Sequence, residues 1–100
     1  GKIDAIKNAE ALNSSPVISM DQQNLYISVT PEFLLAGCKG EIVFFRPSDS
    51  SKDVTLNMQF NAEGKQTIPK DKFQKGHYKA QLSWVSGNKK YYKEEALVVD

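Results

Sequence analysis

The last quarter of the chain constrains the fold most, because its apolar and polar side chains alternate with the period of a β-strand. Residues 77–84 carry apolar side chains at every second position: Tyr78, Ala80, Leu82 and Trp84. A period of two is typical of a strand with one buried face. Residues 86–88 (Ser-Gly-Asn) favour a turn, because Gly and Asn tolerate positive φ. A second strand-like run covers residues 91–99, so the sequence predicts an antiparallel hairpin.

Five shorter segments upstream also have the composition or alternation of strands, and they cover residues 17–20, 25–30, 41–46, 53–61 and 66–69. The alternation over residues 53–61 predicts four inward side chains: Val54, Leu56, Met58 and Phe60. Residues 41–46 are apolar on both faces, which is typical of a central strand. With the hairpin this makes seven short strands at the spacing of an all-β protein. We therefore expect an Ig-like antiparallel β-sandwich.

Two details of this sandwich follow from single segments. Tyr78 comes just after Gly76 at the start of the sixth strand, where sandwiches often carry a tyrosine corner. Residues 31–40 are expected to form a loop, whose three consecutive apolar side chains cover one end of the core: Phe33, Leu34 and Leu35.

Residues 2–12 (KIDAIKNAEAL) form the one helical candidate, because they are rich in alanine and carry a narrow apolar stripe. A helix of this length is marginal unless it docks on something else. We therefore divide the chain into a short helix and linker over residues 1–13 and a β-sandwich domain over residues 14–100. Because the sequence begins with Gly1 and not Met, we expect residues 1–13 to follow a membrane anchor that precedes this sequence.

Composition argues against several classes of protein. The net charge is +1, and Arg46 is the single arginine, so we expect no nucleic-acid partner. Cys38 is the single cysteine, so no disulfide can form within the chain. No run of about eighteen apolar residues is present, so no segment of this sequence is expected to span a membrane.

Four residues are the candidates for a soft-metal site, because copper prefers Cys, His and Met ligands: Cys38, His77, Met20 and Met58. None of them has the spacing of a metal motif, so we predict neither a metal nor another cofactor. One histidine and one cysteine without a nucleophile-elbow motif do not indicate a catalytic triad. Glu94 and Glu95 are neighbours on a strand and point to opposite faces, so they cannot act as an acid–base pair. We expect a protein that is not an enzyme.

The segment Lys89–Lys93 (KKYYK) allows two interpretations. Its lysines and tyrosines could bind a polyanion or an anionic lipid surface. Alternatively, the lysines protect an exposed strand edge from aggregation, with one tyrosine ring pointing inward and the other outward. We prefer the second interpretation.

Three segments together resemble the soluble domain of FixH-type proteins, in the form found in Bacteroidetes-like bacteria. They are residues 42–49 (IVFFRPSD), 75–84 (KGHYKAQLSW) and 87–94 (GNKKYYKE). The helix over residues 2–12, followed by Ser15-Pro16-Val17, resembles that family's link between anchor and domain. The likeness extends over nearly the whole chain.

The resemblance implies a domain on the periplasmic side of the cytoplasmic membrane, held there by one N-terminal transmembrane helix. FixH-type proteins are implicated in the maturation or stability of cbb3-type cytochrome c oxidase. The implied partners are therefore oxidase subunits or a copper-transporting ATPase. The family has no agreed catalytic residues, so none is carried over to this chain.

Two alternatives to an assembly role remain open. The first is a generic Ig-like periplasmic module that binds a sugar or another envelope ligand, which would favour exposed rings at Tyr26, Trp84 or Tyr91. The second is copper handling through the four soft-ligand residues, which requires their sulfur and nitrogen atoms to converge.

Overall fold

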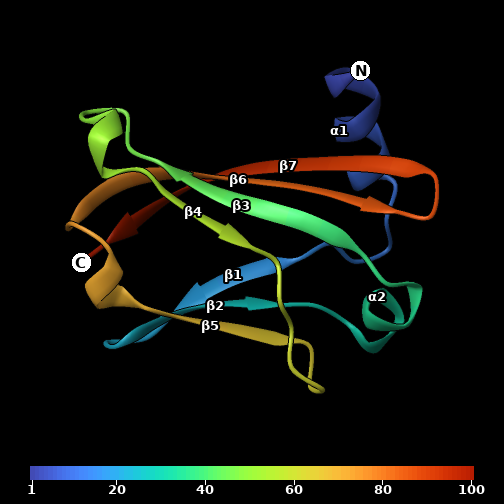
Figure 1. The fold of residues 1–100 in the computed structure, drawn as a ribbon, viewed down its shortest axis with the longest axis horizontal. Coiled ribbons are helices and arrows are strands. Elements are labelled where there is room, and N and C mark those ends of the chain that lie inside the picture. Colours follow the sequence, from blue (N-terminus) through green and yellow to red (C-terminus); the bar gives the residue numbers. More distant parts are fainter.

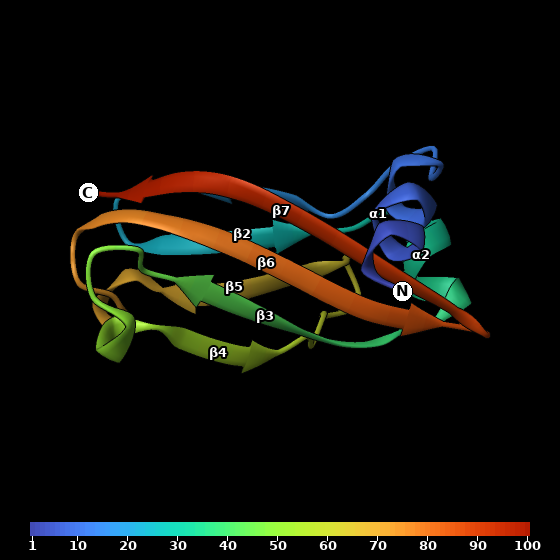
Figure 2. The ribbon, with the colours of Figure 1, turned by 90° about the horizontal axis from the view of Figure 1, so that it is seen from above.

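The computed structural model describes residues 1–100 and places seven strands in two antiparallel sheets, as Figures 1 and 2 show. The strands are β1 (Val17–Met20), β2 (Asn24–Ser28), β3 (Lys39–Phe45), β4 (Val54–Asn57), β5 (Lys65–Pro69), β6 (Gly76–Ser86) and β7 (Lys89–Val99). The helical elements are α1 (Lys2–Glu10), α2 (Pro31–Ala36), η1 (Ser50–Lys52) and η2 (Lys70–Lys72).

The strand order is that of an Ig-like sandwich. One sheet has the order β1-β2-β5 and the other β4-β3-β6-β7, and every pairing is antiparallel. These correspond to strands A-B-E and C-F-G of an immunoglobulin domain, with β4 added beside the C-like strand. The predicted all-β sandwich of seven strands is confirmed.

The core lies between the two sheets and is built by the alternation seen in the sequence. The four apolar positions of β6 are all buried: Tyr78, Ala80, Leu82 and Trp84. Facing side chains come from the other strands: Leu25, Ile27, Ile42, Phe44, Ile68 and Val99. Alternation places these side chains on one face of each strand, and their burial is the main force that holds the sheets together.

The predicted tyrosine corner is confirmed. The Tyr78 hydroxyl donates to the Gln74 carbonyl at 2.7 Å and accepts from Nη1 of Arg46 at 3.2 Å. The Arg46 guanidinium also lies over the Tyr78 ring, 5.4 Å from its centroid. This buried phenol therefore joins the segment that leads into β6 to the end of β3.

The prediction of a loop over residues 31–40 is wrong for residues 31–36, which form the helix α2. Thr30 caps this helix, because its side chain accepts from the Phe33 amide at 3.2 Å, and Pro31 occupies the first turn. Both residue types favour a helix start. Phe33 packs against the core as expected, but Leu35 is 89% exposed and covers nothing. The helical turn points Leu35 away from the side on which Phe33 packs.

Several other boundaries differ from the prediction by two or more residues. The helix α1 ends at Glu10 and not at residue 12, and β4 ends at Asn57 and not at residue 61. Beyond Asn57, the side chain of Gln66 takes the place of a neighbouring strand: its Nε2 donates to the Asn57 carbonyl and its Oε1 accepts from the Gln59 amide. A side chain from the second sheet thus ends the ladder early, although the inward side chains of residues 53–61 still pack on the core.

The helix α1 packs against β7, an edge strand of the four-stranded sheet, as Figure 2 shows. Ala5 and Ala9 are buried in this contact. Nδ2 of Asn8 donates to the carbonyl of Lys90 at 2.8 Å, so the helix satisfies one edge acceptor. Covering an edge in this way protects it from pairing with other chains.

Candidate functional site

The four candidate metal ligands do not converge on one place. Cys38 and Met58 line one small pocket beside Phe33 and Phe60. His77 lies at the opposite end of β6 from Ser86, whose hydroxyl donates to the Gly37 carbonyl at 2.7 Å, next to Cys38. Nine residues of strand separate these ends by about 30 Å. A single ion therefore cannot contact both Cys38 and His77.

Met20 lies with Lys70 and Asp100, far from the pocket of Cys38. The structure contains no group of three or more His, Cys, Asp or Glu side chains that could hold a metal ion. Burial raises the pKa of the Cys38 thiol, which disfavours the thiolate that acts as nucleophile or ligand. The only pair of soft ligands that the fold brings together is Cys38 and Met58.

Glu94 and Glu95 lie on opposite faces of β7, as the sequence predicts. Glu94 accepts from Nε2 of Gln81 at 3.1 Å and from the Tyr92 hydroxyl at 3.0 Å. The bond from Tyr92 is the main cause that lowers the pKa of Glu94, and burial is the main cause that raises the pKa of Tyr92 to about 12. Glu95 pairs instead with Lys93, at 3.7 Å. Both carboxylates are engaged in separate local contacts.

The two tyrosines of the KKYYK segment point to opposite faces. Tyr91 pairs with Trp84 across the β6–β7 ladder and stacks on its ring, with centroids 5.4 Å apart and an interplanar angle of 7°. Tyr92 lies on the outer face beside α1, where Nζ of Lys2 is 4.5 Å from its ring centroid. The structural interpretation of the tyrosines is confirmed.

Lys93 is half-buried on the edge strand β7, with 29% of its side chain exposed, and lies on the same face as Tyr91. Its ammonium donates to the Pro16 carbonyl at 2.8 Å and to the Ser15 hydroxyl at 3.2 Å. An inward charge on an edge strand is a recognised device against edge-to-edge association. Lys93 is therefore explained by the fold itself.

A cavity of about 110 Å³ lies between α2, the segment that follows α1 and the β6–β7 hairpin. Its aromatic side chains are Phe33, Trp84 and Tyr91, and its polar ones include Asn13 and Thr30. The Trp84 ring is only 2% exposed, and the Phe33 ring packs on it at 5.8 Å between centroids. Sugars stack on exposed rings, so the burial of Trp84 speaks against a sugar-binding surface here.

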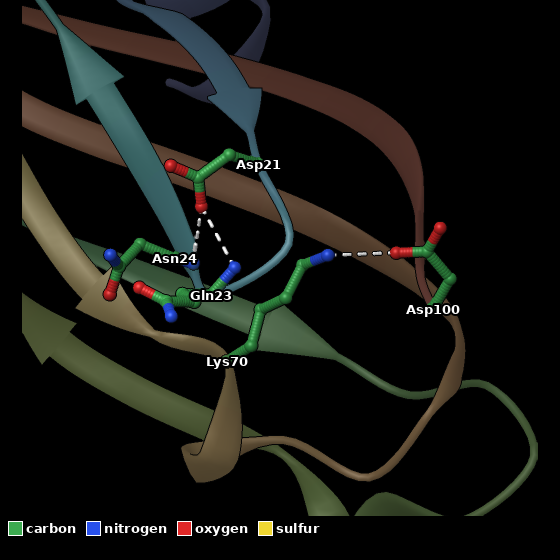
Figure 3. A network of polar contacts seen from close by, with 5 residues as sticks. All are labelled: Asp21, Gln23, Asn24, Lys70 and Asp100. Carbon is green, nitrogen blue, oxygen red and sulfur yellow. Dashed lines mark hydrogen bonds and ion pairs between the residues drawn. The ribbon is translucent and has the colours of Figure 1, made fainter.

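The opposite end of the sandwich contains a polar network, drawn in Figure 3. Oδ1 of Asp21 accepts from the amides of Gln23 and Asn24 at 2.9 and 2.8 Å, and Lys70 pairs with Asp100 at 2.8 Å. Lys70 also donates its amide to the Gln23 carbonyl at 2.9 Å, which joins the turn to η2.

The carboxylates of this network have lowered pKa values. The Tyr26 hydroxyl donates to Oδ2 of Asp21 at 2.6 Å and is the main cause that lowers the Asp21 pKa. The hydrogen bond from Lys70 is the main cause for Asp100. We call this end, with Tyr78 and its partners, the corner end. The charged groups of this network are held in place by neighbours on the same chain.

Comparison with known proteins gives one match. The sequence model of the FixH family matches residues 1–98. Neither the curated proteins nor the solved structures contain a significant match. Among the helices of the structure, none has the length and apolar character needed to cross a bilayer. The family expected from the β3 and hairpin residues is thus confirmed: the chain belongs to the FixH family, whose members are in general membrane-anchored extracytoplasmic proteins related to cbb3-type cytochrome oxidase.

Proposed function

We propose that this chain is a non-enzymatic domain on the periplasmic side of the cytoplasmic membrane that acts in the assembly or stability of a cbb3-type cytochrome c oxidase. It would act through protein–protein contact with oxidase subunits or with a copper-transporting ATPase of the same membrane. The observation that carries the proposal is the family match over residues 1–98.

The geometry supports a binding role over a chemical one. The single histidine is about 30 Å from the single cysteine along β6, so His77 cannot activate Cys38 as a nucleophile. Glu94 and Glu95 face opposite sides of the sheet. The sandwich instead presents an outer sheet face and two ends of different character, which are features suited to contact with another protein.

The first test is genetic. Deletion of the gene is expected to lower the amount of assembled cbb3 oxidase and its cytochrome c oxidation rate, and complementation with the full-length gene restores both. A variant that keeps its membrane anchor but lacks the sandwich should fail to complement. Normal oxidase content and activity in the deletion strain would overturn the proposal.

The second test identifies the partner. The full-length protein is solubilised from membranes and its co-purifying proteins are identified by mass spectrometry, with an unrelated anchored Ig-like domain as control. Oxidase subunits or the copper ATPase should be enriched over that control. Recovery of envelope glycans or unrelated proteins alone would favour the generic binding module.

Copper handling through all four soft-ligand residues fails, because they do not converge. A narrower copper role is a second candidate, because the fold brings Cys38 and Met58 into one pocket. Thiolate and thioether sulfur are soft ligands that select Cu(I). If the pocket handles copper, Cys38→Ser abolishes complementation, and added copper restores the oxidase. If the domain acts through protein contact alone, Cys38→Ser complements as well as the wild type.

A further inference from the structure

The register of three strands places two lysines on one line across the outer face of the four-stranded sheet. Lys39 of β3 pairs with Val85 of β6, and Val85 pairs with Lys90 of β7. Neighbouring strands are about 4.8 Å apart, so the two lysine backbones are about 10 Å apart with Val85 between them. Val85 is 42% exposed. The result is a short cationic row with an exposed aliphatic side chain at its centre.

Two more lysines lie around this row. Lys89 is at the tip of the β6–β7 hairpin, opposite Ser86. Lys2 of α1 lines the same open groove of about 670 Å³ as Lys39 and Lys90. We call the four residues Lys2, Lys39, Lys89 and Lys90 the basic tip.

The basic tip has an excess of unpaired positive charge. The ion pairs of the structure join Gly1 to Asp4, Lys70 to Asp100 and Lys93 to Glu95, so no lysine of the tip is paired with a carboxylate. The groove is lined by three of these lysines, Lys2, Lys39 and Lys90, and by one carboxylate, Glu41. The other carboxylates of α1 and β7 do not line it: Asp4, Glu10, Glu94 and Glu95. Since the net charge of the chain is only +1, this asymmetry is local.

An exposed leucine lies at the same end of the molecule. Leu35 is 89% exposed, and α2 is tied to the hairpin by the bond from Ser86 to the Gly37 carbonyl. Figure 1 shows α1, α2 and the turn between β6 and β7 gathered at this end. Exposed apolar side chains beside lysines are the combination that binds membrane interfaces, where the ammonium groups contact phosphates and the apolar groups enter the headgroup region.

We propose that the basic tip, with Leu35 and Val85, docks on the anionic headgroup surface of a lipid bilayer. The inference goes beyond the proposed function and does not depend on which protein is the partner. Charge complementarity favours lipid headgroups as the occupant. The lysines come from α1, β3 and the hairpin and surround a broad open groove, and a point charge such as Lys suits many phosphate orientations. A narrow slot for one extended peptide is not formed.

The test measures binding of the purified chain to vesicles. Vesicles of phosphatidylglycerol and phosphatidylethanolamine are compared with vesicles of phosphatidylcholine, at about 50 mM salt and again at about 500 mM, where surface charges are screened. The wild type should sediment with the anionic vesicles at low salt only. Each lysine near the surface contributes about a fivefold change in partitioning, so Lys39→Gln/Lys89→Gln/Lys90→Gln should lower it roughly a hundredfold.

A matched control is available at the corner end. Lys52→Gln/Lys72→Gln/Lys75→Gln removes the same charge from three exposed lysines and should change partitioning by no more than a few fold. Leu35→Ser should weaken binding without changing its salt dependence. All six lysines are exposed, so the variants should fold, and circular dichroism verifies this.

Three results would each overturn the inference. One is no binding of the wild type to anionic vesicles at low salt. Another is an equal loss in the two triple variants, which would indicate a response to net charge alone. The third is that the wild type binds no vesicles but is retained on immobilised poly-glutamate, while the triple variant of the tip is not retained. That result would indicate an acidic polypeptide as the partner of the tip. None of these results changes the genetic test of the oxidase role.

Discussion

The two ends of the sandwich differ in how their polar groups are satisfied. At the corner end, the Tyr78 hydroxyl bonds both Gln74 and Arg46, and Lys70 pairs with Asp100. At the basic tip, four lysines have no carboxylate partner, Leu35 projects into solvent, and a cavity of about 110 Å³ remains beside Trp84. Figure 1 shows the two ends at opposite extremes of the long axis.

The difference indicates a division of roles within one small domain. Groups that are satisfied internally contribute to the free energy of folding and have little left to offer a partner. Groups that are unpaired contribute little to folding and remain free to bind. We therefore expect substitutions at polar positions of the corner end to lower stability, and lysine substitutions at the basic tip to leave stability nearly unchanged. The buried side chain of Trp84 under the basic tip is the exception, because its substitution should lower stability.

Trp84→Ala should have the largest effect, because it empties the core beneath the basic tip. The ring packs on Tyr91 and Phe33 and is only 2% exposed. Removal of a buried aromatic side chain costs about 3–5 kcal/mol of unfolding free energy. Urea denaturation measures this loss. The neighbouring Val85→Ala removes an exposed side chain and should cost less than about 0.5 kcal/mol. Equal losses for the two variants would show that Trp84 does not support this end.

Gly40→Ala should come next. A Cβ at this position would lie 2.4 Å from the Ser83 carbonyl oxygen and 2.6 Å from Cβ of Trp84. Both contacts are with β6, so β3 and β6 must separate where they are paired, at a cost of about 1–3 kcal/mol. Thermal unfolding should show a clearly lower Tm. At Gly1 an added Cβ meets nothing within 4 Å, so Gly1→Ala is the neutral control. An unchanged Tm for Gly40→Ala would mean that the two strands are not held in close contact.

Tyr78→Phe tests the corner end at a smaller scale. The substitution keeps the ring, which packs edge-on against Phe73 with centroids 5.6 Å apart, and removes only the hydroxyl. The Gln74 carbonyl and the Arg46 guanidinium then lose a partner, which should cost about 1–2 kcal/mol in urea denaturation. Tyr26→Phe removes a hydroxyl bonded at the surface and should cost less. If the order of these two losses were reversed, the tyrosine corner would not be the anchor of this end.

The strands were predictable from sequence because alternation is local. Residues 77–84 show the buried face of β6 without any knowledge of its neighbours, and Tyr78 could be placed at the corner from its position after Gly76. The helix α2 was missed because the apolar run from Phe33 to Leu35 suggested core, although Thr30-Pro31 carries a helix-start signal. The early end of β4 depends on the side chain of Gln66, which no local pattern reveals.

The candidate sites were less predictable than the strands. The sequence groups Cys38, His77, Met20 and Met58 only by chemistry, and the fold brings only Cys38 and Met58 together. The cationic row of the basic tip could not be predicted at all, since Lys39 and Lys90 are joined only by the register of β3 and β7 on β6. Family membership could be predicted because short motifs in β3 and the hairpin carry it.

The smallest effect we predict is the acid dependence of the corner end. Hydrogen bonds from Tyr26, Gln23 and Asn24 lower the pKa of Asp21 below its ordinary value of 3.8, so the folded chain binds this proton more weakly than the unfolded chain. The resulting stabilisation is complete above pH 3.8 and is lost as the pH falls through the folded pKa. Asp21→Asn should therefore lower Tm near neutral pH and reduce the further fall of Tm between about pH 4 and pH 2.

The control for this titration is an acidic residue at the other end. Asp4→Asn removes a carboxylate whose contact is to the terminal amine of Gly1 at 3.4 Å, which is longer than any of the Asp21 bonds. The fall of Tm between about pH 4 and pH 2 should be the same in Asp4→Asn as in the wild type. Suppose that Asp4→Asn reduced the fall of Tm at acid pH as much as Asp21→Asn does. Acid unfolding would then result from general charge repulsion and not from the hydrogen-bonded carboxylates of the corner end. A selective effect of Asp21→Asn would mean that the hydrogen bonds to Asp21 contribute specifically to the acid dependence of folding.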